Sequence, residues 1–528
     1  FLVSANKNIT DKFSVGLNLG GNRQISQFNN YEVTAPQLLI PGIYSLNNTR
    51  VALVNSVYDG NKVINSLYGA VQFAYNNYLF LDVTARNDWS SALTLPVGAD
   101  TLGNTVNSYF YPSASLSAII SDMVTFPSWV SFAKVRTSIA QVGNDTDPYR
   151  FSSSYGRSDP WGDYPVYGST STLLNYNLKP EISTSWEAGL DWRFFNNRLG
   201  IDFSYYNINT RNQRLPSVPI SITSGYWNRV VNAGQIRNYG YELMLTGRPV
   251  DGKDFKWDVI VNWSANRSKV VKFDGEITDY QMASRHGITI RAQVGNRMGD
   301  MYSIGFKKVD DPSSPYFGQQ IFNSEGRFVG TNDIVKVGNY NPDWLAGIRN
   351  TFTYKNLSFS FLFDARYGGQ LFSETWVVGL EAGQLIETLE GRADGYDLSK
   401  EGNGLIGKGV IQNPDGTYRV NDVKLTAREY HQSRTGNRDI EEGGVFDADF
   451  IKLRELRLGY SFSPKILSRI KVKGLNVSIV GRNLAVWTDV PHIDPETSSL
   501  AGGTIIPGVE SVGMPTTRSW GFNLGFNF

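Results

Sequence analysis

The chain has 528 residues and an almost balanced charge, with 50 Lys and Arg against 49 Asp and Glu. This balance argues against a nucleic-acid binder, which presents a strongly basic surface. The absence of cysteine excludes a disulfide framework, a thiolate zinc site and a cysteine nucleophile. Mean hydropathy is −0.28, and no stretch approaches the roughly 20 apolar residues of a membrane-spanning helix. A membrane location would therefore require a closed β-barrel.

Segments in which apolar residues alternate with polar or small residues recur along the whole chain. Successive side chains of a strand point to opposite faces, so each segment predicts a strand with one apolar and one polar face. We count about fourteen strands, each close to the ~10 residues that a tilted membrane strand needs. The clearest segments are 13–20, 79–86, 186–194, 199–206, 239–246, 257–264, 359–366, 455–462 and 518–528.

The last of these segments shows the alternation without a break. A soluble sandwich strand can alternate in the same way, but a chain that stops on the aromatic residue itself is less usual there. Outer-membrane barrels place such side chains toward lipid and polar groups toward the lumen. We therefore interpret this segment as a barrel-assembly strand whose lipid-facing residues are Trp520, Phe522, Leu524, Phe526 and Phe528.

The second face of the predicted strands carries many charged residues. They are too frequent for the packed core of a sandwich, and they suit a water-filled lumen. We expect them to form interior ion pairs or contacts with other parts of the protein in preference to substrate contacts. The residues that alternation directs into the lumen include Asp82, Arg86, Asp191, Arg193, Asp364 and Arg366.

The connections between the predicted strands alternate between short and long. Outer-membrane barrels have short periplasmic turns and long extracellular loops, and counting back from the last strand puts every long connection on one side. Short turns are expected at 75–77, 121–129, 195–197, 250–254, 355–356 and 464–473. Extracellular loops are expected near 23–62, 89–106, 143–183, 210–237, 267–342, 369–448 and 488–517.

The chain begins at Phe1 in a segment that reads as the inside of a strand, with no initiator Met and no signal peptide. Fourteen strands could close a small porin. The opening segment instead favours the C-terminal part of a larger barrel, with residues 1–528 forming one barrel portion.

Several short motifs along the chain carry a family resemblance. In chain order they are Ala85–Ser91, Asn177–Glu181, Ser185–Leu199, Val337–Asp343, Phe450–Leu456, Gly481–Leu484, Asp494–Glu496 and Pro515–Arg518. Together they resemble the corresponding segments of TonB-dependent transporters, most closely the SusC/RagA-like branch of Bacteroidetes. The resemblance covers most of the chain.

The resemblance implies a 22-stranded barrel in the outer membrane, occluded by an N-terminal plug that this chain lacks. It also implies active import of oligosaccharides or peptides, energised by TonB acting on the missing N-terminal region. A SusD-like surface lipoprotein would form a lid over the barrel, and two SusCD units could pair as a dimer. Two alternatives remain open, namely a passive porin or scaffold barrel and a secreted polysaccharide-binding protein.

Aromatic residues in the long loops are candidates for contact with substrate or with the lid protein, although packing within the loops is the simpler interpretation. These residues are Trp161, Tyr164, Tyr167, Trp227 and Trp376. Other candidates are weaker. Asp145–Asp147 offers half of a calcium site, and the paired carboxylates Asp310–Asp311 and Glu441–Glu442 fall in loops where solvated charge is expected. We expect no metal, no cofactor and no enzymatic activity.

Overall fold

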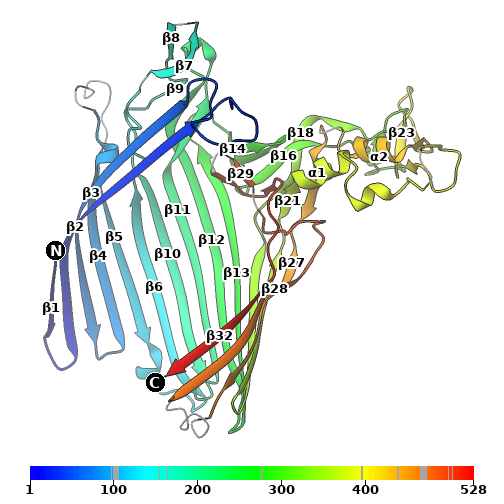
Figure 1. Ribbon diagram of the computed structural model, residues 1–528. Helices are drawn as coiled ribbons and strands as arrows, with labels where there is room; N and C mark the ends of the chain where they lie inside the picture. The colour runs from blue at the N-terminus through cyan, green and yellow to red at the C-terminus, as the bar shows by residue number, and fades with distance from the viewer. Residues whose placement is uncertain are drawn as a thin grey trace.

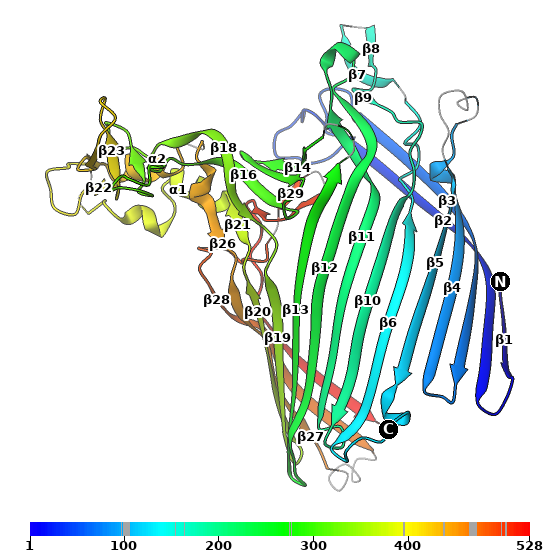
Figure 2. The same cartoon turned by 180° about the vertical axis from the view of Figure 1, so that it is seen from behind.

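The computed structural model describes residues 1–96, 98, 106–153, 155–162, 164–273, 275, 277–393, 396–436, 439–463, 472–497, 499–501 and 504–527. Its main feature is a tall, curved antiparallel sheet of tilted strands (Figures 1 and 2). The sheet has 16 strands, and all but the short β9 (Thr172–Leu173) follow one another in a single path. The predicted antiparallel architecture is confirmed, and the predicted count of about fourteen strands is close.

We call this path the wall. In sheet order its strands are β1 (Leu2–Asn8), β2 (Phe13–Thr34), β3 (Val54–Tyr75), β4 (Leu79–Ser90), β5 (Ser108–Ile119), β6 (Val130–Asn144), β10 (Glu181–Phe194), β11 (Leu199–Pro219), β12 (Asn228–Asp251), β13 (Phe255–Phe273), β19 (Trp344–Tyr354), β20 (Leu357–Tyr367), β27 (Phe450–Ser461), β28 (Gly474–Thr488) and β32 (Ser519–Asn527). Among the described residues no pairing joins β1 to β32, so these two strands are the edges of the wall.

The short turns lie where the sequence predicts them, at 76–78, 195–198, 252–254 and 355–356. Asn76, Asn77 and Asn196 have φ near +50° to +60°, a conformation that asparagine tolerates better than most residues and that tight hairpin turns require. These turns lie at one end of the wall, and the long connections lie at the other (Figures 1 and 2). Most of the predicted turn 464–473 lies outside the described residues.

The register of β28 and β32 sorts the C-terminal side chains into two faces. Phe522, Leu524 and Phe526 are the partners of Ile479, Val477 and Leu475, so one face is wholly apolar. Trp520 lies on the same face, and all four predicted aromatic and aliphatic positions are exposed. Contact of this face with lipid remains a prediction. Phe528 lies outside the described residues.

Five strands are about twice as long as predicted, and one of them, β13, has 19 residues and extends six residues past the expected loop start at 267. β2 and β3 have 22 residues each, and β11 and β12 have 21 and 24. The expected loops 23–62 and 210–237 are therefore too long, because the strands stay paired and leave connections of only 35–53 and 220–227. Beyond residue 22 both faces of the β2–β3 hairpin are largely exposed, so the apolar alternation fades while the backbone pairing continues without a register shift.

The longest connections are folded and form a protruding body, which we call the loop domain (277–342 and 369–448; Figure 1). Its core buries Ile290, Met301, Phe372, Trp376 and Val377, joined by Val509 from the last connection. No helix among the described residues has the length and apolar character needed to cross a bilayer. The described helices of the loop domain are α1 (Glu374–Glu381) and α2 (Ala427–Arg434).

Small sheets complete the connections. A four-stranded sheet contains β14 (Asp279–Arg285), β15 (Ile288–Gln293), β16 (Asp300–Phe306) and β18 (Gly330–Asn339). Two three-stranded sheets contain β17 (Ile321–Phe322), β23 (Val410–Gln412) and β24 (Tyr418–Val420), and β26 (Val445–Asp447), β21 (Gln370–Ser373) and β31 (Val509–Glu510). The two-stranded pairs are β7 (Gly156–Trp161) with β8 (Tyr164–Gly168), β22 (Leu405–Ile406) with β25 (Lys424–Leu425), and β29 (Ser499–Ala501) with β30 (Thr504–Ile506).

Candidate functional site

The polar face of the wall carries charged side chains that are paired with their neighbours. Asp82 accepts a hydrogen bond of 2.7 Å from the Gln72 amide. Arg86 donates through Nε to Asp88 at 2.7 Å, and the Tyr111 hydroxyl donates to the same carboxylate at 2.6 Å. Both predicted charges of β4 are therefore held within the wall.

A second group of charges spans three neighbouring strands. Asp191 and Arg193 pair along β10 at 3.2 Å. Arg136 of β6 reaches across β10 to Asp202 of β11, at 2.7 Å. Gly189 leaves room for this crossing, because a Cβ atom there would lie 2.8 Å from the Arg136 Nε and the guanidinium would have to shift. A glycine inside a strand thus permits the close approach of a side chain from the neighbouring strand.

These charges surround a hollow in the polar face with a volume of about 670 Å³. Its charged lining comes from β6, β11, β12, β20 and β27, through Arg136, Asp202, Glu242, Asp364 and Arg454. Because side chains from widely separated strands border one hollow, the polar face is the concave, inner face of the wall. Asp364 lines this hollow. Arg366 does not, since its guanidinium turns toward the connections and donates to the Tyr340 carbonyl at 2.6 Å.

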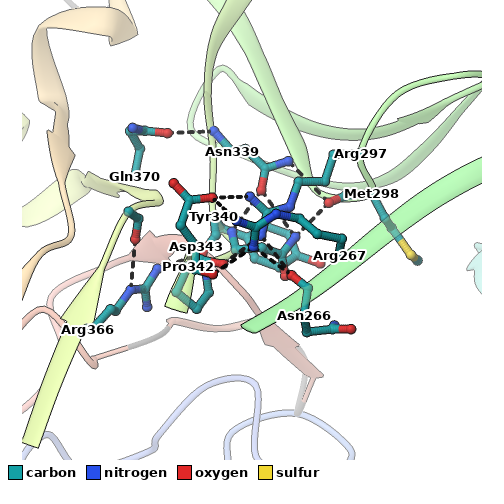
Figure 3. A network of polar contacts seen from close by, with 12 residues as sticks. Asn266, Arg267, Arg297, Met298, Asn339, Tyr340, Pro342, Asp343, Arg366 and Gln370 are labelled. Carbon is teal, nitrogen blue, oxygen red and sulfur yellow. Dashed lines mark hydrogen bonds and ion pairs between the residues drawn. The ribbon is translucent and has the colours of Figure 1, made fainter. Parts of the chain in front are cut away.

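The 337–343 motif lies where the loop domain meets the wall (Figure 3). Arg297 donates to the Pro342 carbonyl at 2.6 Å, and Arg267 of β13 donates to the Asp343 carbonyl at 2.7 Å. Both guanidinium groups also contact the Asp343 carboxylate, at 3.2 and 3.1 Å. The motif therefore fastens the base of the loop domain to β13 and β19.

The Asp494–Glu496 motif fastens the last long connection to the inner face of β27. Lys452 is only 3% exposed and contacts both Asp494 and Glu496, the latter at 2.5 Å. Arg454 bridges Glu496 at 2.5 Å and Asp364 at 2.7 Å. Burial acts to raise the pKa of Asp494, but hydrogen bonds from Lys452 and Thr516 outweigh it and hold the pKa below its ordinary value.

The 177–181 motif fastens the connection before β10. Leu178 is buried against Leu93, Tyr109 and Phe151. The Glu181 carboxylate accepts hydrogen bonds from the Arg214 backbone N–H at 2.8 Å and from two neighbouring side-chain amides at 3.1 and 3.2 Å. The motif thus has a structural role in this chain.

The predicted loop aromatics fall into two groups. Trp161, Tyr164 and Tyr167 stand exposed on the β7–β8 hairpin, and Trp227 is exposed beside the start of β12. Trp376 is different, because it is only 2% exposed, packs edge-on to Phe446 and lies under the Arg434 guanidinium. The interpretation of Trp376 as a contact residue is therefore wrong, since helix α1 turns the indole into the core of the loop domain.

Most of the weaker carboxylate candidates have protein partners. Asp145 is contacted by the Lys62 ammonium at 3.0 Å and the Ser90 hydroxyl at 2.5 Å, and Asp147 pairs with Arg150 at 2.6 Å. The expectation that Glu441 is solvated is wrong, because it is buried and accepts from the Ser303 hydroxyl. In the described part of the chain, no group of three or more potential ligands could hold a metal ion.

An antiparallel wall with an apolar outer face, a charged inner face, short turns at one end and long connections at the other defines an outer-membrane β-barrel protein. The family described as TonB dependent receptor-like, beta-barrel matches residues 2–300, which is more than half of the chain. The chain belongs to this family and is an outer-membrane protein.

Two curated relatives and one solved structure illustrate the similarity. TonB-dependent receptor P3 of Formosa agariphila is 27% identical over 488 residues, which cover 86% of this chain and 44% of that protein. TonB-dependent receptor SusC of Bacteroides thetaiotaomicron is 26% identical over 472 residues, covering 84% and 42%. The chain thus spans about half the length of the curated relatives it matches. The structure of the RagAB peptide transporter matches with a TM-score of 0.72 and 18% identity over 100% of this chain and 55% of the other, which shows a shared fold.

Proposed function

We propose that this chain is the barrel portion of a SusC-like importer that takes up oligosaccharides or peptides across the outer membrane by a TonB-dependent mechanism. The observation that carries the proposal is the charged inner wall joined to a folded loop domain, in a chain similar to SusC over 84% of its length. The open edges at β1 and β32 support completion of the wall by further strands, because unpaired backbone groups in hydrocarbon each cost several kcal/mol.

The mechanism follows from these parts. A SusD-like lipoprotein docks on the long connections and delivers the substrate, with the exposed β7–β8 hairpin and Trp227 as candidate contacts. TonB acts on a plug contributed by another part of the protein, and substrate then passes along the inner face. Because Asp82, Arg86, Asp191 and Arg193 already have partners in the wall, they shape the lumen and do not serve as free charges for substrate. The proposal contains no bond-changing step.

The test is purification of the full-length protein in detergent from its native cells, followed by mass spectrometry and an uptake assay. We expect a SusD-like lipoprotein to co-purify, and we expect uptake to stop when the proton-motive force is collapsed. Passive diffusion that continues without this energy, in the absence of a lipoprotein, would instead support the porin alternative.

The proposed topology predicts which engineered cysteines react from outside the cell. Glu401 is exposed in the loop domain, and Lys253 is exposed in the short turn between β12 and β13. Residues 1–528 contain no cysteine, so each variant adds the single thiol of this part of the protein, and the unsubstituted protein serves as the labelling blank. We expect a membrane-impermeant maleimide to label Glu401→Cys on intact cells and Lys253→Cys only after the outer membrane is ruptured. The reverse pattern would invert the topology.

A further inference from the structure

A second hollow lies at the loop end of the wall, between the extended part of the β2–β3 hairpin and the connection 145–151. Its volume is about 570 Å³, which is within the range of ligand sites. It is lined by three aromatic residues and three charged residues, namely Phe28, Tyr58, Tyr149, Lys62, Asp147 and Arg150. We call it the aromatic pocket.

The three rings come from three separate segments and are arranged around the pocket. The ring centroids of Phe28 and Tyr58 lie 6.0 Å apart at an interplanar angle of 56°, and those of Tyr58 and Tyr149 lie 6.5 Å apart at 73°. Neither pair is stacked face to face, so the rings do not cover one another completely. Phe28, Tyr58 and Tyr149 are 63%, 42% and 52% exposed. Gly60, the partner of Phe28 across the hairpin, adds no side chain to fill the space between them.

The pocket faces the lumen. β2 and β3 pair without a register shift, so Phe28, Tyr58 and Lys62 continue the face that carries Tyr68 and Gln72 farther along the wall. Gln72 contacts Asp82 on the charged inner face. A molecule held by these rings would therefore lie at the loop end of the path along that face.

The position of Tyr149 is imposed by its surroundings. Its φ is +64°, a left-handed conformation that is unfavourable for a bulky residue and that persists only where neighbouring structure enforces it. The chain is fixed before and after Tyr149. Before it, Asp145 is bound by Lys62 and Ser90, and after it, Phe151 is buried in a hydrophobic cluster with Leu93. The Tyr149 hydroxyl accepts from the Asn61 backbone N–H at 3.3 Å. The ring is thus fixed in place before a ligand arrives.

The polar groups of the pocket select the class of ligand. Arg150 pairs with Asp147 at 2.6 Å and Lys62 pairs with Asp145 at 3.0 Å, so opposite charges balance and no strong field favours an ionic ligand. The backbone groups of β2 and β3 pair with each other, and on the outer side of β3 the N–H groups of Asn61 and Val63 donate to the Tyr149 and Ser91 hydroxyls. The pocket itself therefore presents few free backbone groups to an extended peptide, and the unpaired outer edges of the hairpin lie outside its lining. What remains is a set of ring faces bordered by hydrogen-bonding groups. A pyranose ring matches this arrangement, because it presents C–H groups on its faces and hydroxyls around its rim.

We propose that the aromatic pocket binds a pyranose unit of a neutral oligosaccharide at the outer end of the lumen. This proposal rests on the import function proposed above and narrows its substrate class to carbohydrate.

The experiment uses the full-length protein with its co-purifying partners in detergent, applied to immobilised malto-, cello-, xylo-, manno- and laminari-oligosaccharides of two to six units. We expect the protein to bind at least one series. Tyr58→Ala and Tyr149→Ala should each weaken that binding about tenfold or more, because each removes one ring face, whereas Tyr149→Phe should keep most of it. Tyr44→Ala is the matched control, since Tyr44 is 89% exposed at the tip of the same hairpin and does not line the pocket.

Three results would overturn the proposal: no binding to any series, equal binding by Tyr58→Ala and the native protein, or displacement of the glycan by a peptide pool.

Uptake of the bound oligosaccharide, measured in cells, tests glycan binding by the aromatic pocket separately from the proposed import function. Import that is equal in native and Tyr58→Ala cells overturns the pocket and leaves import standing. Ring-dependent binding without uptake supports the pocket and contradicts import. Unchanged partner co-purification and thermal unfolding of each variant show that folding is intact.

Discussion

Replacement of Lys452 by methionine is expected to release the connection 489–497 from the inner face of β27 and to lower the stability of this anchor by about 3–5 kcal/mol. The native ammonium is nearly fully buried and lies between the carboxylates of Asp494 and Glu496. Methionine fills a similar volume but leaves the carboxylates without their cation. Removing one partner of a buried ion pair costs much more than removing an exposed one.

The measurement is limited proteolysis and thermal unfolding of the detergent-purified protein, with cleavage near Pro491 as the readout. Lys134→Met is the matched control, because Lys134 lies on the polar face of β6 and no ion pair involves it among the described residues. We expect little change in the control. Equal protease resistance of Lys452→Met and the native protein would show that the connection is held by other contacts.

Acid should act on the same anchor in the native protein. The pKa of Asp494 is held below its ordinary value in the folded state, so its contribution to stability is present above that ordinary value. The contribution is lost as the pH falls through the lowered pKa. Protease sensitivity at Pro491 should therefore rise only in strong acid and stay constant between about pH 5 and 8.

The wall could be predicted from the sequence because successive side chains along each strand alternate between the apolar outer face and the polar inner face. This pattern is local and does not depend on contacts between distant segments. Trp186, Trp192 and their neighbours in 186–194 show this clearly, and the structure pairs this segment as β10. The loop-end parts of β2 and β3, residues 23–34 and 54–62, could not be predicted in this way. Both faces of the hairpin are largely exposed there, so the side chains do not alternate regularly between apolar and polar although the backbone is paired.

The loop domain could not be predicted, because its folding depends on contacts between distant segments. Trp376 is buried by residues from three connections, including Val509, and Glu441 accepts from Ser303, which is 138 residues away. Nothing local distinguishes these residues from exposed loop residues. The capping box at the start of α2, formed by Thr426 and Glu429, and the N-cap Ser373 of α1 are local signals of these two short helices.

Arg454 shows why not all of the side chains on the inner face could be predicted from alternation. Strict alternation places it with Leu456 on the apolar face. The register shifts between Leu453 and Glu455, and this bulge turns Arg454 inward to meet Asp364 and Glu496. A single inserted residue reverses the face of a side chain, and its position is set by the neighbouring strands. The glycine that admits Arg136 across β10 depends in the same way on tertiary geometry.

Replacement of Leu524 by arginine is expected to destabilise the folded barrel by about 2–4 kcal/mol, if the apolar face of β32 contacts lipid near the middle of the membrane. Leu524 lies mid-strand opposite Val477, among Phe522 and Phe526, and its side chain is exposed. An arginine there would place a charge in hydrocarbon, a cost that declines toward the membrane interfaces.

Asn523→Arg is the matched control, because Asn523 is the next residue along β32 and lies opposite Ser478 on the polar face. A charge on that face meets the water of the lumen, so we expect a much smaller loss. The readouts are the yield of heat-modifiable barrel in isolated outer membranes and the free energy of unfolding of the full-length protein in lipid vesicles. Equal losses for the two variants would contradict the assignment of the Trp520–Phe526 face to lipid, since the two substitutions add the same side chain to one strand and differ chiefly in the face on which it lies.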